Sequence, residues 1–368
     1  MQQYFKYIII TLVILIAVAV FATVVLPRTS VEVPRISAGS VQADQITVSQ
    51  HFPFERASVT LVFPADASLY NGAKSADKSV TIRGNVSEPE WLTASYQSMV
   101  NDSAQDGFYQ ALTGEFSKMK RDQGLSDDEY VELLMAYVQS LQYVTTPDNP
   151  AKFPIETAVD RAGDCDDKSL LLAGLLAHEG YKVALLSFGQ ESHMAVGIGS
   201  DDTLYKNTGY AYIETTNFSF VAIPPDSLRG GVVLQSDPLV VPIGSGTKVY
   251  HRGKETRYIN DMYTLSGQKL AQIAVEVNAL GDELDAQKVQ ISRLESEMQQ
   301  AKSSGNTAWY NTQVPVHNNL ISEYNTRLAT FRELKSRYDV YADVYNYILR
   351  HEYDRKGVYE YVKTHMPA

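Results

Sequence analysis

Cys165 is the only cysteine in a chain of 368 residues, and it stands in the run Gly163-Asp164-Cys165-Asp166-Asp167, directly before an apolar stretch. A lone cysteine cannot form an internal disulfide. A glycine turn followed by apolar residues predicts that the thiol lies in the first turn of a helix. Unpaired backbone N–H groups and the helix dipole favour the thiolate there. The position therefore suits a nucleophile, and the alternative is a buried structural thiol.

Two further residues with suitable chemistry follow, on segments that resemble strands. His193 opens the alternating run 193–198, and Glu214 lies in the middle of the run 210–216. The segment 182–188 predicts a strand before them. Catalysis by a thiol needs a thiolate, an imidazole that relays the proton and an acid that fixes the imidazole tautomer. The sequence supplies all three in the order cysteine, histidine, acid.

These residues belong to a set of spaced motifs within 125–220. The motifs are Gly163-Asp164-Cys165-Asp166-Asp167 with the Leu/Ala-rich stretch behind it, Glu179-Gly180-Tyr181-Lys182-Val183, His193-Met194-Ala195-Val196 and Tyr212-Ile213-Glu214-Thr215-Thr216. Together they resemble the transglutaminase-like superfamily. The resemblance implies an α+β, papain-like core with a Cys-His-acid triad, here Cys165, His193 and Glu214.

The chain departs from the family pattern at two of these positions. Glu214 stands where the family more often has Asp, and Met194 stands where many members have Trp. The longer side chain of Glu214 changes the backbone distance from which it reaches the imidazole. The family also implies an oxyanion donor upstream of the cysteine, for which Gln142 and Tyr143 are the candidates.

Three acids, Asp164, Asp166 and Asp167, surround the cysteine. Acids in a first helical turn cap the N–H groups and complement the helix dipole. The same charges oppose ionisation of the thiol. The sequence favours the capping role over a metal site, because no histidine or second cysteine stands near. No metal and no cofactor is predicted for the chain.

The composition excludes one large class of partners. The chain has 32 basic and 43 acidic residues, a formal net charge of −11, and no basic cluster, so nucleic-acid binding is not expected. A hydrophobic fraction of 44% predicts a folded chain.

The N-terminus carries an uncharged apolar run of 20 residues over 7–26. This length suits a transmembrane helix, whereas the core of a cleaved signal peptide is shorter. The sequence predicts an uncleaved single-pass anchor that binds the membrane, with the soluble part outside the cytoplasm. Residues 27–50, rich in small and polar side chains, are predicted to form a tether.

The transglutaminase-like domain is predicted to occupy 51–262. A strand is expected over 58–63 and a loop over 65–78. Helices are expected over 90–120 and 127–143, the second with an acidic first turn.

The C-terminal third has a different, heptad-like pattern. Its first seam is Leu270, Ile273, Val277, Leu280, Leu284, Gln287, Ile291, Leu294, Met298 and Ala301. Its second seam is Leu320, Tyr324, Arg327, Phe331, Leu334, Tyr338, Tyr341, Tyr345 and Ile348. Gln287 and Arg327 are the polar exceptions. An antiparallel coiled-coil hairpin over 263–350 follows, with a tail over 351–368.

Two functions from different classes fit the sequence. The first is a cysteine-dependent acyl-transfer enzyme acting on a protein or peptide, as a protease or amidase rather than as a cross-linking enzyme. The second is a non-catalytic binding module that works through the hairpin, because fold alone does not establish activity. Residues 265–350 offer a surface for a protein partner or for self-association.

Overall fold

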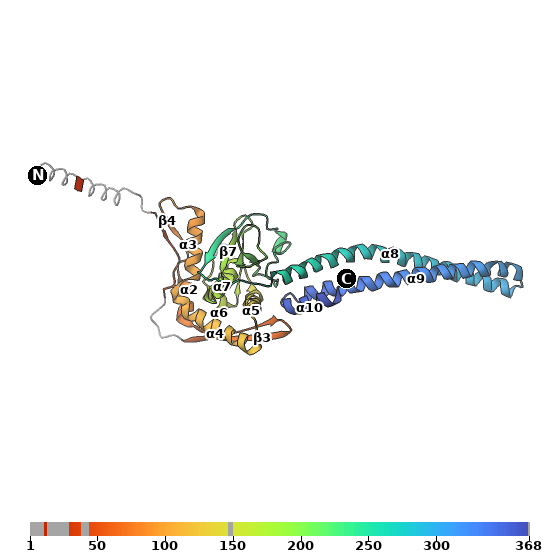
Figure 1. The fold of residues 1–368 in the computed structure, drawn as a ribbon, viewed down its shortest axis with the longest axis horizontal. Helices are drawn as coiled ribbons and strands as arrows, with labels where there is room; N and C mark the ends of the chain where they lie inside the picture. The colour runs from red at the N-terminus through yellow and green to blue at the C-terminus, as the bar shows by residue number, and fades with distance from the viewer. Residues whose placement is uncertain (1–10, 13–28, 38–43, 146–149, 367–368) are drawn as a thin grey trace, which may run out of the picture. The chain divides into compact units, whose positions relative to one another are not determined.

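The computed structural model describes residues 11–12, 29–37, 44–145 and 150–366, and the fold is α+β (Figure 1). The chain divides into two compact units. Unit 1 holds the described residues up to 52 together with 58–218 and 224–251, and unit 2 holds 53–57, 219–223 and the chain from 252 onward.

The centre of unit 1 is a four-stranded antiparallel sheet in the order β10-β7-β8-β9. Its strands are β7 (Val183–Phe188), β8 (His193–Ile198), β9 (Ala211–Ile213) and β10 (Leu239–Ile243). The register places Phe188 opposite His193. Every residue of β8 and β9 is buried, so both faces of these strands belong to the core.

Helix α7 (Cys165–His178) packs against this sheet and is buried along almost its whole length. From Leu170 to Ala177 its sequence is apolar on all sides, which is typical of a helix enclosed in a core. The hydroxyl of Ser169 donates to the carbonyl of Met194 at 3.1 Å and so ties α7 to β8. The ammonium group of the fully buried Lys168 donates to the carbonyls of Gln139 and Leu141, at the end of the neighbouring helix.

Four further helices of unit 1 pack against α7. They are α3 (Glu88–Val100), α4 (Asp106–Gln123), α5 (Asp127–Ser140) and α6 (Pro154–Asp160). The sequence predicts one helix over 90–120, whereas the structure has a break with the short 3-10 helix η1 (Ser103–Gln105). The Asp102 carboxylate accepts from the Ala104 N–H at 3.0 Å and caps this turn, which explains the break.

The N-terminal part of unit 1 differs from the tether that the sequence predicts over 27–50. Strand β1 (Ser30–Glu32) pairs with β4 (Thr81–Arg83), and β2 (Gln45–Phe54) pairs with β3 (Ala57–Asp66). The side chains of β2 and β3 alternate between exposed and buried, so an amphipathic ribbon replaces the flexible segment.

The loop expected over 65–78 is in fact a helix, α2 (Ala67–Ser75). The Asp66 carboxylate accepts from the N–H groups of Ser68 and Leu69 and forms its N-cap. Asn71 and Ser75 lie on the exposed side of this helix, while Leu69, Gly72 and Ala73 are buried.

The predicted transmembrane helix over 7–26 is contradicted, and with it the single-pass membrane anchor from which the extracytoplasmic location was inferred. A helix that spans a bilayer needs about 20 consecutive apolar residues. In the part of the chain that the structure describes, no helix is long and apolar enough. The longest helices there carry charged residues throughout their sequences. Of the predicted span, all but Thr11 and Leu12 lies outside the described residues.

Unit 2 is built on two long helices, α8 (Gly253–Ser303) and α9 (Thr307–Arg350), which pack as an antiparallel pair (Figure 1). The two polar exceptions of the seams meet, because the Arg327 guanidinium donates to Gln287 Oε1 at 2.8 Å. The side-chain amide of Gln287 in turn donates to the carbonyl of Leu320.

The tail predicted over 351–368 instead forms a third helix of unit 2, α10 (Arg355–His365). Its Val358 and Val362 are fully buried in a cluster with α8 and α9. The Asp354 carboxylate accepts from the Gly357 N–H at 2.7 Å and caps this helix. Burial of one apolar stripe and an N-terminal cap therefore explain why these residues are helical.

Candidate active site

The thiol of Cys165 lies against the start of β8. It donates to Asp166 Oδ1 at 3.5 Å, lies 4.0 Å from the carbonyl of Ser192, and accepts from the backbone N–H of Met194. Ser192 and Met194 flank His193 in the chain, so the sulfur is held beside the histidine backbone. Cys165 is 9% exposed. The nucleophile candidate is thus enclosed between the first turn of α7 and the start of β8.

The imidazole of His193 is held in place by the carboxylate of Glu214. His193 Nε2 lies 3.2 Å from Glu214 Oε2, and these residues are 8% and 1% exposed. His193 Nδ1 makes no hydrogen bond with the residues that the structure describes. A ring whose Nε2 donates to a carboxylate has its lone pair on Nδ1, and that nitrogen can accept a proton.

The carboxylate of Glu214 is saturated with donors. Oε1 accepts from the N–H groups of Thr215 and Thr216 and from the Thr216 hydroxyl, and Oε2 accepts from the Tyr212 hydroxyl at 2.6 Å. Burial raises the pKa of Glu214, but the hydrogen bond and charge of His193 and the hydrogen bonds from Thr216 and Tyr212 outweigh it and bring the pKa to about 2. Glu214 is therefore an anion at neutral pH.

The position of Glu214 explains how the longer acid is accommodated. The sequence places it in the middle of a strand, but β9 ends at Ile213. Within a strand, successive side chains must point to opposite faces of the sheet, but Glu214 lies beyond the end of β9 and is free of this constraint. It turns back to accept from the backbone of the next two residues, Thr215 and Thr216.

The ionisation of the thiol differs from the expectation based on the helix dipole. Burial, followed by the charge of Asp166, raises the pKa of Cys165, and Asp164 adds to this effect. The N–H of Met194 lowers the pKa by less. In this structure the thiol is therefore neutral at pH 7, because desolvation and two nearby carboxylates outweigh the N–H groups of the helix.

The three acids around the cysteine have separate roles. Asp164 is the N-cap of α7 and accepts from the N–H groups of Asp166 and Asp167. Asp167 completes a capping box by accepting from the Asp164 N–H, and it also accepts from the Lys152 N–H at 2.7 Å. Asp166 accepts from the thiol. The capping role predicted from the sequence thus describes two of the three.

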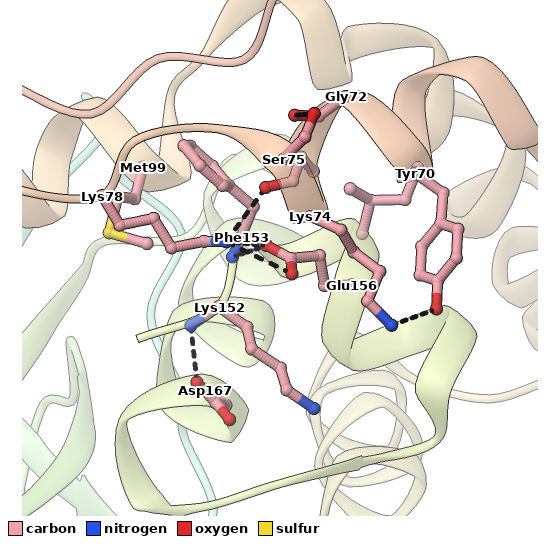
Figure 2. Close-up of polar contacts among 12 residues, drawn as sticks. Tyr70, Gly72, Lys74, Ser75, Lys78, Met99, Lys152, Phe153, Glu156 and Asp167 are labelled. Carbon is pink, nitrogen blue, oxygen red and sulfur yellow. Dashed lines mark hydrogen bonds and ion pairs between the residues drawn. The ribbon is translucent and has the colours of Figure 1, made fainter. Parts of the chain in front are cut away.

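A polar network holds the segment that precedes the cysteine (Figure 2). The Lys152 N–H bonds to Asp167 of α7, and its ammonium group bonds to Asp160 Oδ2 at 3.0 Å. Glu156 accepts from the Phe153 N–H and pairs with Lys78 at 3.1 Å. Figure 2 shows Lys152 bonded to Asp167 of α7, and Glu156 of α6 bonded to Lys78 and to the Phe153 N–H. The network fixes the approach of the chain to the cysteine turn.

The oxyanion candidates Gln142 and Tyr143 form the short strand β5, which pairs in parallel with β6 (Ala162–Gly163). Their backbone therefore lies beside the residues that precede Asp164. The side chain of Gln142 is exposed. No hydrogen bond between described residues joins the Gln142 side chain to Cys165 or His193. The oxyanion role stays a prediction.

Two tyrosines of this site, Tyr212 and Tyr96, were not among the residues predicted from the sequence. Tyr212 bonds to Glu214 and lies 3.4 Å from His193 Nε2. Burial, followed by the charges of Asp166, Cys165 and Asp164, raises the pKa of Tyr96 in α3, so this side chain lies within electrostatic range of the thiol. Tyr212 stands two positions before Glu214, and this spacing could have predicted that it lies beside the acid. Tyr96 stands 69 positions before Cys165, and no pattern in the sequence connects the two residues.

Within the described ranges, no group of three or more His, Cys, Asp or Glu residues is arranged to hold a metal ion. Comparisons with models of protein families, with curated proteins and with solved structures found no match in any of the three. The resemblance to transglutaminase-like proteins accordingly rests on the sequence motifs alone.

Proposed function

We propose that this chain is a cysteine-dependent acyl-transfer enzyme of transglutaminase-like type that uses Cys165, His193 and Glu214. One observation carries the proposal: the thiol lies between the backbone groups on either side of His193, while the far nitrogen of that ring is bound to Glu214. A thiol, an imidazole and an anionic carboxylate in this order fit nucleophilic catalysis.

The reaction begins when the Cys165 sulfur attacks the carbonyl carbon of an amide. The thiol proton passes to His193 Nδ1, a carbon–sulfur bond forms, and the carbonyl π bond opens to an oxyanion. Collapse of this intermediate breaks the carbon–nitrogen bond, and His193 returns the proton to the leaving amine. A thioester remains on Cys165. Glu214 keeps the imidazole in one tautomer and stabilises the imidazolium.

Water then releases the acyl group, with His193 taking a proton from the attacking water and returning it to the sulfur. This sequence makes the enzyme a protease or amidase. An amine in place of water would give a cross-link. We propose hydrolysis as the main outcome, because water needs no second binding site. The substrate class is a protein or peptide amide.

Activity towards amides tests the proposal without knowledge of the natural substrate. The full chain is incubated with an unfolded protein such as casein and a fluorescent primary amine. New chain termini or released ammonia report hydrolysis, and incorporated fluorescence reports transfer to the amine. Cys165→Ala should abolish either product, while Gly114→Ala, on the exposed side of α4, should retain it. Product formation by Cys165→Ala would refute the mechanism.

A second candidate function, association through the hairpin, is favoured by a shallow, largely open depression at the turn of unit 2. Its volume is about 450 Å³, and it is lined by Glu297, Gln300, Ala301, Ser304, Asn306 and Trp309. A partly exposed tryptophan beside polar groups is typical of interfaces. Light scattering should then show self-association that Cys165→Ala retains and Trp309→Ala loses. A monomer at all concentrations would exclude self-association.

A further inference from the structure

Asp166 differs from the two acids beside it in what it contacts. Asp164 and Asp167 accept from backbone N–H groups at the start of α7. Asp166 instead accepts from the thiol of Cys165, at 3.5 Å from Oδ1 to Sγ. Its carboxyl therefore touches the atom that attacks the substrate in the proposed reaction.

The charged and titratable groups around the thiol come from four elements. The start of α7 contributes Asp164 and Asp166, and β8 contributes His193, whose charge acts on Asp166. Helix α3 contributes Tyr96, and β9 contributes Tyr212. Of these, only His193 gains a positive charge. Asp164 and Asp166 are thus the groups whose negative charge opposes a thiolate, and among the described residues the Met194 N–H is the one backbone donor to the sulfur.

We propose that Asp166 is a further catalytic residue, which holds the Cys165 thiol in its protonated form until a substrate carbonyl arrives. The inference rests on the proposed function, because it concerns the nucleophile of that reaction. An S–H group that donates to a carboxylate keeps its proton, since a thiolate would repel the same carboxylate. The resting enzyme then carries little thiolate and reacts slowly with adventitious electrophiles.

The same carboxylate assists the next step. When the sulfur attacks, the S–H bond breaks and the proton bonds to His193 Nδ1, so the site loses a thiol hydrogen bond and gains an imidazolium. Asp166 attracts that cation, as the effect of His193 on its pKa shows. Asp166 itself neither gains nor loses a proton in this step. Its charge therefore opposes a free thiolate but favours the imidazolium that accompanies the bound acyl group.

The test is the rate at which iodoacetamide alkylates Cys165 in the full chain between pH 6 and 9. Asp166→Asn and Asp166→Ser both remove the charge, so a variant that fails to fold leaves the other to report. We expect alkylation at pH 7 to become at least about tenfold faster in both, which corresponds to a fall of one unit in the thiol pKa.

Asp127→Asn is the matched control, because Asp127 is also an acid in a first helical turn, in α5, with no contact to the thiol. It should alkylate at the wild-type rate. Rates in Asp166→Asn and Asp166→Ser that equal or fall below the wild type would overturn the inference. Faster alkylation in both, combined with no acyl transfer by the wild type, would overturn the proposed function while leaving the effect of Asp166 on the thiol established.

Discussion

At the scale of single residues, the site holds carboxyl groups whose environments push their pKa values in opposite directions. Glu214 has donors on both oxygens, and its pKa falls to about 2 although burial opposes this. Asp166 and Asp167 are buried beside Asp164, and burial followed by that charge raises the pKa of each to about 6. Such separation is typical of sites that combine an anionic and a proton-sharing carboxyl.

Glu214 should stabilise the fold only where it is ionised. Its folded pKa lies below the ordinary value of 4.5, so its contribution is present above pH 4.5 and is lost as the pH falls towards 2. We expect the wild type to lose about 3 kcal/mol more than Glu214→Gln over this interval. Urea unfolding at pH 5, 3.5 and 2 measures the difference. A gap between the two proteins that does not change with pH would contradict this assignment.

Asp166 and Asp167 should stabilise the fold where they are protonated, which is the opposite of the effect of Glu214. Their folded pKa values lie above 3.8, so their contribution is complete below pH 3.8 and is lost as the pH rises through about 6. The free energy of unfolding should therefore rise when the pH is lowered from 7 to 5. Asp167→Asn should reduce that rise, and Asp127→Asn should not. An equal rise in both variants would exclude the carboxyl of Asp167 as its source.

The sequence indicated the types and order of Cys165, His193 and Glu214, because a glycine turn and two alternating runs are local patterns. It could not show that Asp166 faces the sulfur while Asp164 and Asp167 face the backbone. That division depends on the rotation of the first turn of α7 against β8. Desolvation of the thiol likewise comes from packing, and it raises the pKa of Cys165 although the helix dipole alone would lower it.

At the scale of elements, the sequence predicted those helices whose boundaries are set by residues within or next to the helix. The capping box of α5, formed by Ser126 and Glu129, is visible in the sequence. Helix α2 was missed because Asp66 reads equally well as a turn residue or as an N-cap. Helix α10 was missed because its burial depends on α8 and α9, which are distant in the sequence.

The packing of α7 on α4 should depend on the absence of a side chain at Gly174. A Cβ there would lie 2.1 Å from the hydroxyl oxygen of the fully buried Tyr109. Tyr109 is held by its bond to the Val100 carbonyl and by stacking on His178, so it cannot move away cheaply. We expect Gly174→Ala to lower the free energy of unfolding by about 1–3 kcal/mol in urea denaturation.

Gly114 provides the matched control for this substitution. It lies inside α4 and is exposed, and a Cβ at this position would meet no described atom beyond its own helix within 4 Å. Gly114→Ala should stabilise the fold by about 0.5–1 kcal/mol, because alanine favours the helix. Equal effects of the two substitutions would show that helix propensity, and not the contact with Tyr109, sets the cost.

At the scale of the whole molecule, the chain contributes separate segments to each unit. Unit 2 combines 53–57 and 219–223 with the long C-terminal part, and Phe220 lies in its apolar cluster with Val344 and Val358. Within its hairpin, Gln287 and Arg327 pair with each other in otherwise apolar seams. A polar pair of this kind fixes the register of two helices at some cost in stability.

Replacement of Gln287 and Arg327 by apolar residues should therefore raise the stability of the hairpin and weaken the control of its register. We expect Gln287→Leu with Arg327→Leu to raise the thermal midpoint of unit 2, because two apolar side chains replace partly buried polar ones. The apolar seams could then also pair between chains, so light scattering should show larger assemblies than the wild type forms. An unchanged assembly state would indicate that other contacts, such as the stacked Tyr263 and Tyr345, set the register.

The central claim is that His193 takes the proton of Cys165 as an acyl group is transferred. Its most direct test is the rate at which the full chain is acetylated at Cys165 by p-nitrophenyl acetate, an activated acyl donor, followed by intact mass and by release of p-nitrophenolate. We predict that His193→Ala slows this rate by about 10²-fold or more, the usual contribution of a general base, and that Cys165→Ala abolishes it. Acetylation of Cys165 at the same rate with and without the imidazole would contradict the account.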